Sequence, residues 1–199
     1  MIKIFILHTK INPVEKLYSL VIHPPKEILA LVKSMKEQLA TEVGWYNSKN
    51  AVGHITICEF KATETAIVVI KKQISKLCDP LVPVAVHLNE FGSFPNGAFF
   101  IAPDNDSKKD LKRIMSHFSK SIQVADMKKS DNPHLSIARR LSPENLLKAN
   151  QLFTEIDLNF VCESVILRQF DEKVKQFFVI DTFPFNSNSP PEVIQGTLF

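Results

Sequence analysis

The chain has 199 residues, of which 45% are hydrophobic and 23% charged, and its formal net charge is +3. This composition is typical of a soluble globular protein and lacks the concentrated positive charge of a dedicated nucleic-acid binder. The three cysteines are an odd number without a C-x-x-C pair, which excludes a recognisable disulfide framework or cysteine zinc site and favours the cytoplasm. No stretch approaches the roughly 20 apolar residues of a membrane span. Residues 1–8 are apolar too briefly for a signal peptide and predict a strand.

The first half of the chain alternates between strand and helix patterns. The expected elements are a strand at 18–23, a helix at 26–39, a strand at 53–60, a helix at 63–77 and a strand at 81–91. Pro24 and Pro25 are typical of a helix start, and Thr63 is suited to cap the second helix.

The second half follows the same order. The expected elements are a strand at 98–102, a helix opening at Ser107, a strand at 134–138, a helix at 143–153, and closing strands at 161–170 and 176–183. Ser142 is suited to cap the helix that begins at Pro143.

The two halves align at an offset of roughly 80 residues, which indicates an internal repeat. We therefore predict an α+β, bilobal fold with two pseudo-two-fold-related strand–helix–strand–helix–strand halves, residues 16–95 and 96–183, whose antiparallel-rich sheets flank a central cleft. Residues 1–185 would form a single domain, and residues 186–199 a C-terminal tail. The tail composition leaves open a packed arm, a loose tail or a docking peptide.

One short motif occurs in each half, at equivalent positions: H-I-T-I from His54 and H-L-S-I from His134. Residues i and i+2 of a strand face the same way, so His54 shares a face with Thr56, and His134 with Ser136. The repeat brings the two strands together across the cleft. The sequence thus predicts two imidazoles and two hydroxyls around one small space.

These groups suit the cleavage of a phosphodiester. Imidazoles with a pKa near 6.5 can accept and donate protons at neutral pH, and hydroxyls can donate hydrogen bonds to phosphoryl oxygens. A single H-x-T strand is more often structural, but two copies at matching places of a repeat favour function. Two histidines could also bind zinc, although a third ligand is not evident. Cys58 falls on the predicted cleft face beyond Thr56, and we interpret it as a small core filler rather than a nucleophile.

The paired motifs resemble those of the two-histidine (2H) phosphoesterase superfamily, and in particular its 2′-5′ RNA ligase and RNA 2′,3′-cyclic phosphodiesterase branch. The opening Y-S-L-V-I-H-P-P from Tyr18 is similar to that branch's first strand and helix start, and the resemblance covers about residues 16–185. It implies hydrolysis of 2′,3′-cyclic phosphates to 2′-phosphates, or reversible 2′-5′ ligation, with His54 and His134 as the acid/base pair. Thr56 and Ser136 would then bind phosphate; Ser136 replaces the usual threonine but keeps its hydroxyl.

Other side chains are candidates for substrate contacts. By strand alternation Arg140 shares the face of His134, where it would touch a phosphate or end in solvent. Lys128 would lie near the mouth of the cleft and attract an anion, or be solvated. Aromatic residues near the motifs could stack on a base or pack at loop corners: Trp45, Tyr46, Phe91 and Phe94.

We expect an enzyme that needs no metal or cofactor, acts as a cytoplasmic monomer without a membrane, and takes an RNA end or small nucleotide carrying a cyclic phosphate. The alternative is a non-catalytic module of the same fold that binds nucleotides or RNA ends. A third hypothesis is a scaffold whose tail docks on a partner. The intact histidines and hydroxyls favour the enzyme.

Overall fold

The computed structural model describes residues 14–188, and the strand predicted at residues 1–8 and most of the predicted tail lie outside this range. The described elements, in chain order, are β1 Lys16–Ile22, α1 Lys26–Val43, β2 Ile55–Ala62, α2 Glu64–Cys78, β3 Val84–Phe94, β4 Ala98–Pro103, α3 Asn105–Ser121, β5 Lys128–Lys129, β6 Leu135–Ala138, α4 Pro143–Leu152, β7 Leu158–Cys162, β8 Ser164–Asp171 and β9 Gln176–Pro184. Every predicted helix in this range has a counterpart, and so does every predicted strand except the one at 161–170, which divides into two; β5 is additional.

The helix starts show why the sequence folds into these elements. Thr63 Oγ1 accepts a hydrogen bond from the backbone N–H of Ala66 at 3.1 Å and caps α2, as predicted. Ser142 caps α4 in the same way, which confirms that prediction as well. Helix α3 begins before Ser107, because the carboxylate of Asp104 caps it by accepting from the Ser107 N–H at 2.8 Å.

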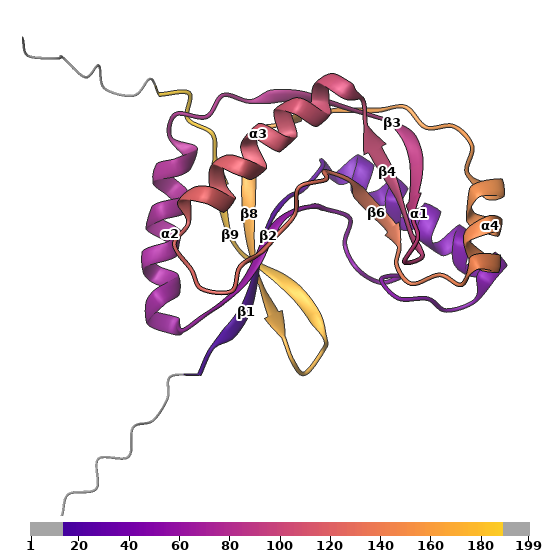
Figure 1. Cartoon of the computed structure of the whole chain (residues 1–199), viewed down its shortest axis with the longest axis horizontal. Helices are drawn as coiled ribbons and strands as arrows, with labels where there is room; N and C mark the ends of the chain where they lie inside the picture. Colours follow the sequence, from indigo (N-terminus) through magenta and orange to yellow (C-terminus); the bar gives the residue numbers. More distant parts are fainter. Residues whose placement is uncertain (1–13, 189–199) are drawn as a thin grey trace, which may run out of the picture.

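The strands form one continuous antiparallel sheet in the order β7-β3-β4-β6-β2-β1-β8-β9, with β5 paired to β2. The sheet curls into two lobes that meet between β6 and β2. Figure 1 shows α1 and α4 together beside β4 and β6, and α2 and α3 together on the opposite side, where α2 contacts β9 and α3 contacts β2 and β3. Each lobe thus combines strands and helices from both halves of the chain, and the fold is the predicted bilobal α+β architecture.

The repeat runs from β1 through β3 and again from β4 through β7, with helices in matching places. The single strand predicted at 161–170 is wrong: the chain breaks at Glu163 into β7, which pairs with β3, and β8, which pairs with β1 and β9. The chain changes lobes here, and the continuous β-rich composition of 161–170 contains no signal for a change of partner. The β8–β9 hairpin has no counterpart in the first half.

The core lies behind the two motif strands. Ile55, Ile57, Leu135 and Ile137 are all fully buried, as expected for residues that face away from the cleft. The three cysteines, Cys58, Cys78 and Cys162, are free and buried, as expected for core thiols. Across residues 14–188, no helix has both the length and the apolar character required to span a membrane.

Candidate active site

The two motif strands meet at the junction of the lobes. Strands β2 and β6 pair antiparallel, with Ile55 opposite Leu135. One residue to either side of this pair, His54 falls opposite Ser136 and Thr56 opposite His134. Directly opposed side chains on one sheet face have Cβ atoms about 5 Å apart, and diagonal neighbours roughly 7 Å. The two imidazoles and two hydroxyls therefore share one face of the sheet, with one imidazole from each lobe.

Both imidazoles are held by the same backbone contact. His54 Nδ1 lies 2.7 Å from the carbonyl oxygen of Val52, and His134 Nδ1 lies 2.8 Å from that of Asn132. A carbonyl oxygen can only accept, so each Nδ1 carries the proton and donates it. The Nε2 of each ring is consequently the nitrogen left to exchange protons with a bound substrate.

The environment of both imidazoles favours the neutral form. Burial is the main cause that lowers the pKa of His54 well below its usual 6.5, and the nearby Arg168 adds to it. Burial also lowers the pKa of His134, with a smaller contribution from the charge of Arg139. His23, next to His54, has its pKa lowered to about 4 by burial and Arg168. Uncharged imidazoles are suited to accept a proton.

The neighbours of the two rings differ. Arg168 on β8 places Nη1 3.2 Å from His54 Nδ1, which already donates to a carbonyl and so cannot accept from the guanidinium. The contact brings a positive charge close to the ring. His134 instead lies against two aromatic rings, with centroids 4.8 Å from Phe100 and 5.5 Å from Phe94. Phe94 was expected to be a candidate for stacking on a base, and in the structure it supports the histidine.

A cavity of about 90 Å³ adjoins His54 and Ser136. Its charged lining consists of Lys36, Glu59, Arg139 and Arg168. Lys36 is only 2% exposed, and its Nζ donates to the carbonyl oxygens of Ser48 at 3.1 Å and Ala51 at 2.7 Å. Burial, with a contribution from Arg139, lowers the pKa of Lys36 to about 8. Three cations against one carboxylate give the cavity a positive character that suits an anion.

Arg139, rather than Arg140, lines this cavity, so the side assigned to Arg140 from alternation is wrong. The cause is a β-bulge in β6: Ser136 pairs with Phe100 and Ala138 with Phe99, which leaves one residue extra between them. A bulge inverts the alternation beyond it. Arg140 has a positive φ of 58° and lies in a neighbouring, larger pocket.

Strand β2 contains the same bulge in the same place. Val21 pairs with Thr56 and Leu20 with Cys58, again with one residue extra. Cys58 is therefore buried in the core and does not face the cleft; its predicted role as a core filler is confirmed. Glu59 takes the cavity side instead. Glu59 and Arg139 each lie five residues after their motif histidine. This shared spacing is the feature of the sequence that could have predicted both as residues of the cavity.

The two aromatic candidates that precede the first motif differ in exposure. Tyr46 is 4% exposed and its hydroxyl donates to the Lys36 carbonyl oxygen at 3.0 Å, so most of its ring is packed against the protein. Trp45 is 73% exposed and borders a pocket of about 400 Å³ that also contains Arg139, Arg140 and Phe177. This pocket shares Arg139 and Phe177 with the cavity beside His54.

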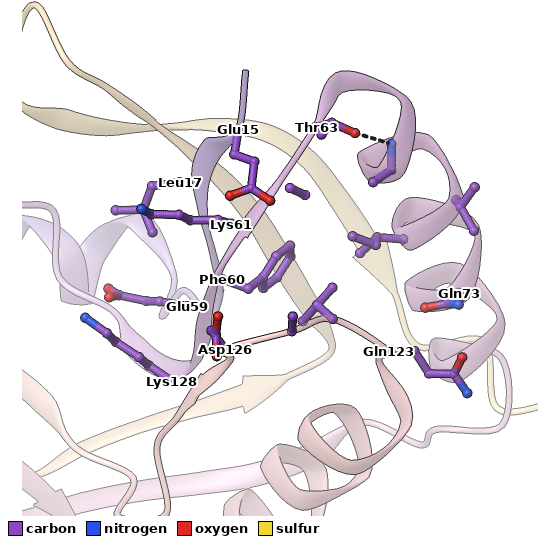
Figure 2. Close-up of a pocket in the computed structure, with 16 residues that line it drawn as sticks. Glu15, Leu17, Glu59, Phe60, Lys61, Thr63, Gln73, Gln123, Asp126 and Lys128 are labelled. Atoms are coloured by element: carbon purple, nitrogen blue, oxygen red, sulfur yellow. Dashed lines mark hydrogen bonds between the residues drawn. The ribbon is translucent and has the colours of Figure 1, made fainter. Parts of the chain in front are cut away.

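A larger pocket of about 680 Å³ lies between β2, α2 and the segment before β5. Figure 2 shows Phe60 in this pocket, with Glu59 and Lys128 on one side and Gln73 and Gln123 on the other. Lys128 lines this pocket rather than the cavity beside His54, and it pairs with Glu59, which borders both. The pocket contains neither motif histidine, so its size alone does not make it the reactive site.

Within residues 14–188, no group of three or more histidine, cysteine, aspartate or glutamate side chains is arranged to hold a metal ion. The register of β2 and β6 puts the two imidazoles and two hydroxyls of the motifs on one face of the sheet, and of these four His54 and Ser136 line the positive cavity. Such a set can bind an anion and move protons on two sides of it.

Solved structures share this fold over most of their length. Escherichia coli LigT in complex with NADP+ is similar to this chain with a TM-score of 0.61 and 9% identity, covering 87% of this chain and 99% of LigT. The LigT complex with 3′-AMP gives a TM-score of 0.62 at 8% identity, covering 86% and 99%. The TT0787 protein of Thermus thermophilus gives 0.60 at 16% identity, covering 86% and 99%. At such identities the similarity shows the fold alone.

A search of curated protein sequences found no match. The model of one protein family, the 2′-5′ RNA ligase superfamily, matches residues 23–173, which is most of the chain and includes both motifs. The fold and the sequence therefore agree, and the chain belongs to the 2′-5′ RNA ligase superfamily, a family of 2H phosphoesterases.

Proposed function

We propose that the protein is a metal-independent phosphoesterase that hydrolyses 2′,3′-cyclic phosphates at RNA or nucleotide ends, or reversibly joins 2′-5′ linkages, with His54 and His134 as the acid/base pair. One observation carries the proposal. Both imidazoles have Nδ1 fixed on a backbone carbonyl, so that both Nε2 atoms remain for proton transfer on a sheet face that also presents two hydroxyls.

Each group has a defined task in this reaction. One imidazole takes a proton from the attacking water while the other donates one to the leaving ribose oxygen, and each transfer typically contributes about 10²- to 10⁴-fold in rate. Thr56 and Ser136 donate hydrogen bonds to the non-bridging phosphoryl oxygens as negative charge develops there. The cationic cavity beside Ser136 attracts the phosphate.

The relatives support a nucleotide-like substrate. E. coli LigT has been crystallised with 3′-AMP, with NADP+, with ATP and with phosphate. These ligands combine a phosphate with, in most cases, a ribose and a base. The exposed Trp45 in the pocket next to the catalytic cavity offers a surface on which a base can stack.

A product assay tests the proposal. The purified protein is incubated with nucleoside 2′,3′-cyclic phosphates and with a short RNA that ends in one, with and without EDTA, and the 2′- and 3′-phosphate products are separated. We expect a single phosphomonoester product and undiminished activity in EDTA. His54→Ala and His134→Ala should each lower turnover by about 10²- to 10⁴-fold.

His117→Ala is the matched control, because His117 contacts the carbonyl oxygen of Leu77 far from the motifs. Its turnover should equal that of the wild type. Full activity in both motif variants would show that His54 and His134 are not the catalytic pair. Binding of these substrates without any product would instead identify a non-catalytic nucleotide-binding module.

A further inference from the structure

The pocket of about 680 Å³ beside β2 has a largely apolar lining and no part in the proposed reaction. Half of its 16 lining residues are apolar, and they include Leu17, Phe60, Val69 and Ile70. Val69 is 57% exposed, although it lies next to the buried Ile70. An apolar pocket of this volume matches the protein sites that bind apolar groups.

One edge of β2 is open along this pocket. Strands β6 and β5 pair with β2 only as far as Glu59. Among residues 14–188, Phe60, Lys61 and Ala62 therefore pair with β1 alone, and all three line the pocket. Successive residues of such a strand direct their backbone N–H and C=O groups to alternate edges, so some of these groups face the pocket. An unpaired edge of this kind accepts an added strand.

Helix α2, on the other side of the pocket, presents an acceptor without a donor. Gln73 lines the pocket (Figure 2), and its Oε1 is buried with no hydrogen-bond partner among residues 14–188. Buried polar atoms in proteins are nearly always hydrogen-bonded, so a donor is expected here. A backbone N–H of an added segment can supply it.

The chain enters the described range beside this pocket. That range opens at Val14, and Glu15 already lines the pocket. Residues 2–7 read I-K-I-F-I-L and belong to the strand predicted at the start of the sequence. Residues 8–14 span at most about 25 Å when extended, so residues 2–7 can reach the pocket.

Charge and attachment also favour this occupant. The charged residues of the lining are three carboxylates and two lysines, whereas residues 1–13 contain two lysines and no acidic residue. A segment held by a short linker has an effective concentration in the millimolar range, which a separate peptide of the same chemistry seldom reaches. The segment is therefore better placed to fill the pocket than an unattached peptide.

We propose that residues 2–7 add as a strand to the open edge of β2 and fill this pocket with their apolar side chains. The docked segment covers Phe60 and Val69 and gives Gln73 Oε1 a backbone donor. It also packs beside Glu59, which borders both this pocket and the cavity beside His54. The inference does not depend on the proposed function, because it involves neither motif histidine.

Hydrogen exchange of the full chain, followed by mass spectrometry, tests the proposal directly. Backbone N–H groups of a docked strand are protected, so peptides covering residues 2–7 should exchange at least roughly 10-fold more slowly than unprotected amides. The protection should not change with protein concentration. Exchange at the unprotected rate would overturn the proposal and leave the pocket to a separate ligand. Protection that rises with concentration would also overturn it, because a second copy would then supply the strand.

Two neighbouring valines of α2 provide a matched pair of variants. Val69 and Val68 are 57% and 54% exposed, but only Val69 lines the pocket. Val69→Asp should abolish the protection of residues 2–7, because a carboxylate does not fit against apolar side chains. Val68→Asp should retain the protection. Equal protection in the two variants would place the segment elsewhere on the protein and contradict the proposal.

Substitutions within the segment provide a test that leaves the described elements untouched. Ile4 and Phe5 point to opposite faces of a strand, so at least one of Ile4→Asp and Phe5→Asp should undock it. The undocked variant should lose its protection and bind a dye for apolar surfaces, such as ANS, several-fold more strongly. Thr9→Asp is the control and should behave as the wild type. Unchanged protection and dye binding in both segment variants would overturn the proposal.

Discussion

The strand that follows His54 and the strand that follows His134 have the same local structure and different surroundings. Each begins with an imidazole bound to a carbonyl, continues with a hydroxyl residue, and bulges at the isoleucine that follows. Arg168 contacts the first ring, and Phe94 and Phe100 contact the second. The comparison teaches that the repeat supplies equivalent reactive groups, while residues outside the motifs make them unequal.

These outside residues come from different parts of the fold. Arg168 belongs to β8, in the hairpin that the first half does not possess, and the two phenylalanines belong to β3 and β4. The motif strands can thus remain alike while the lobes differ. Substitutions that affect one motif and spare the other are the direct way to examine this arrangement.

Of the three comparisons, the largest loss of activity is expected from substituting the hydroxyl residues that the two motifs share. Thr56→Val and Ser136→Ala each remove one hydroxyl while keeping most of the side-chain volume, and each should lower kcat by about 10²- to 10³-fold, the usual cost of losing one transition-state donor. Steady-state kinetics on a nucleoside cyclic phosphate measures both. Thr41→Val, at an exposed position of α1, is the control. A large loss in one variant alone would show that only one hydroxyl reaches the phosphate.

The next comparison concerns the bulge in β6. Arg139→Ala should lower kcat/KM by about 10- to 100-fold, because a charged hydrogen-bond donor in the cavity typically contributes about 1.5 to 3 kcal/mol. Arg140→Ala should have a smaller effect, since Arg140 lies only in the outer pocket. The reverse order of effects would mean that strand alternation, and not the bulge, places the side chain that meets the substrate.

The smallest loss of activity is expected from a substitution that displaces Phe100, one of the two rings that contact His134. Gly92→Ala would place a Cβ 2.6 Å from Phe100 Cε2, so the Phe100 ring, which contacts His134, must shift. Overpacking of this kind costs about 1 to 3 kcal/mol of stability. We expect a several-fold loss of kcat/KM, since misplacing a reactive group slows the reaction. Thermal unfolding and kinetics together measure it, and the titration of His54 by NMR should stay unchanged.

Much of the fold and the centre of the site follow from the sequence. Periodicity predicts the helices and most strands, and the offset between the halves places His54 and His134 at equivalent positions. The rule that i and i+2 share a face correctly predicts which residues turn to the core, because Ile55 and Leu135 are fully buried. Local patterns suffice here because the burial of each motif strand is decided within a few residues.

The remainder depends on contacts that a local pattern does not encode. A bulge changes the side taken by Glu59 and Arg139, yet it adds no unusual residue to either strand. The break at Glu163 moves the chain from one lobe to the other within a β-rich run. Arg168 lies 114 positions from His54, and nothing near Arg168 in the sequence marks it as a neighbour of that histidine.

The junction between β2 and β6 has a consequence for how the catalytic distance is maintained. Within residues 14–188 these two strands are joined at a single opposed pair, Ile55 with Leu135. So short a ladder resists rotation of one lobe against the other poorly, and the resistance must come from interlocking apolar side chains beneath it, including Ile57 and Ile137. The spacing of two polar rings is therefore set by hydrocarbon volume, and trimming a methyl group from these isoleucines is a route to altering reactivity without touching a polar atom.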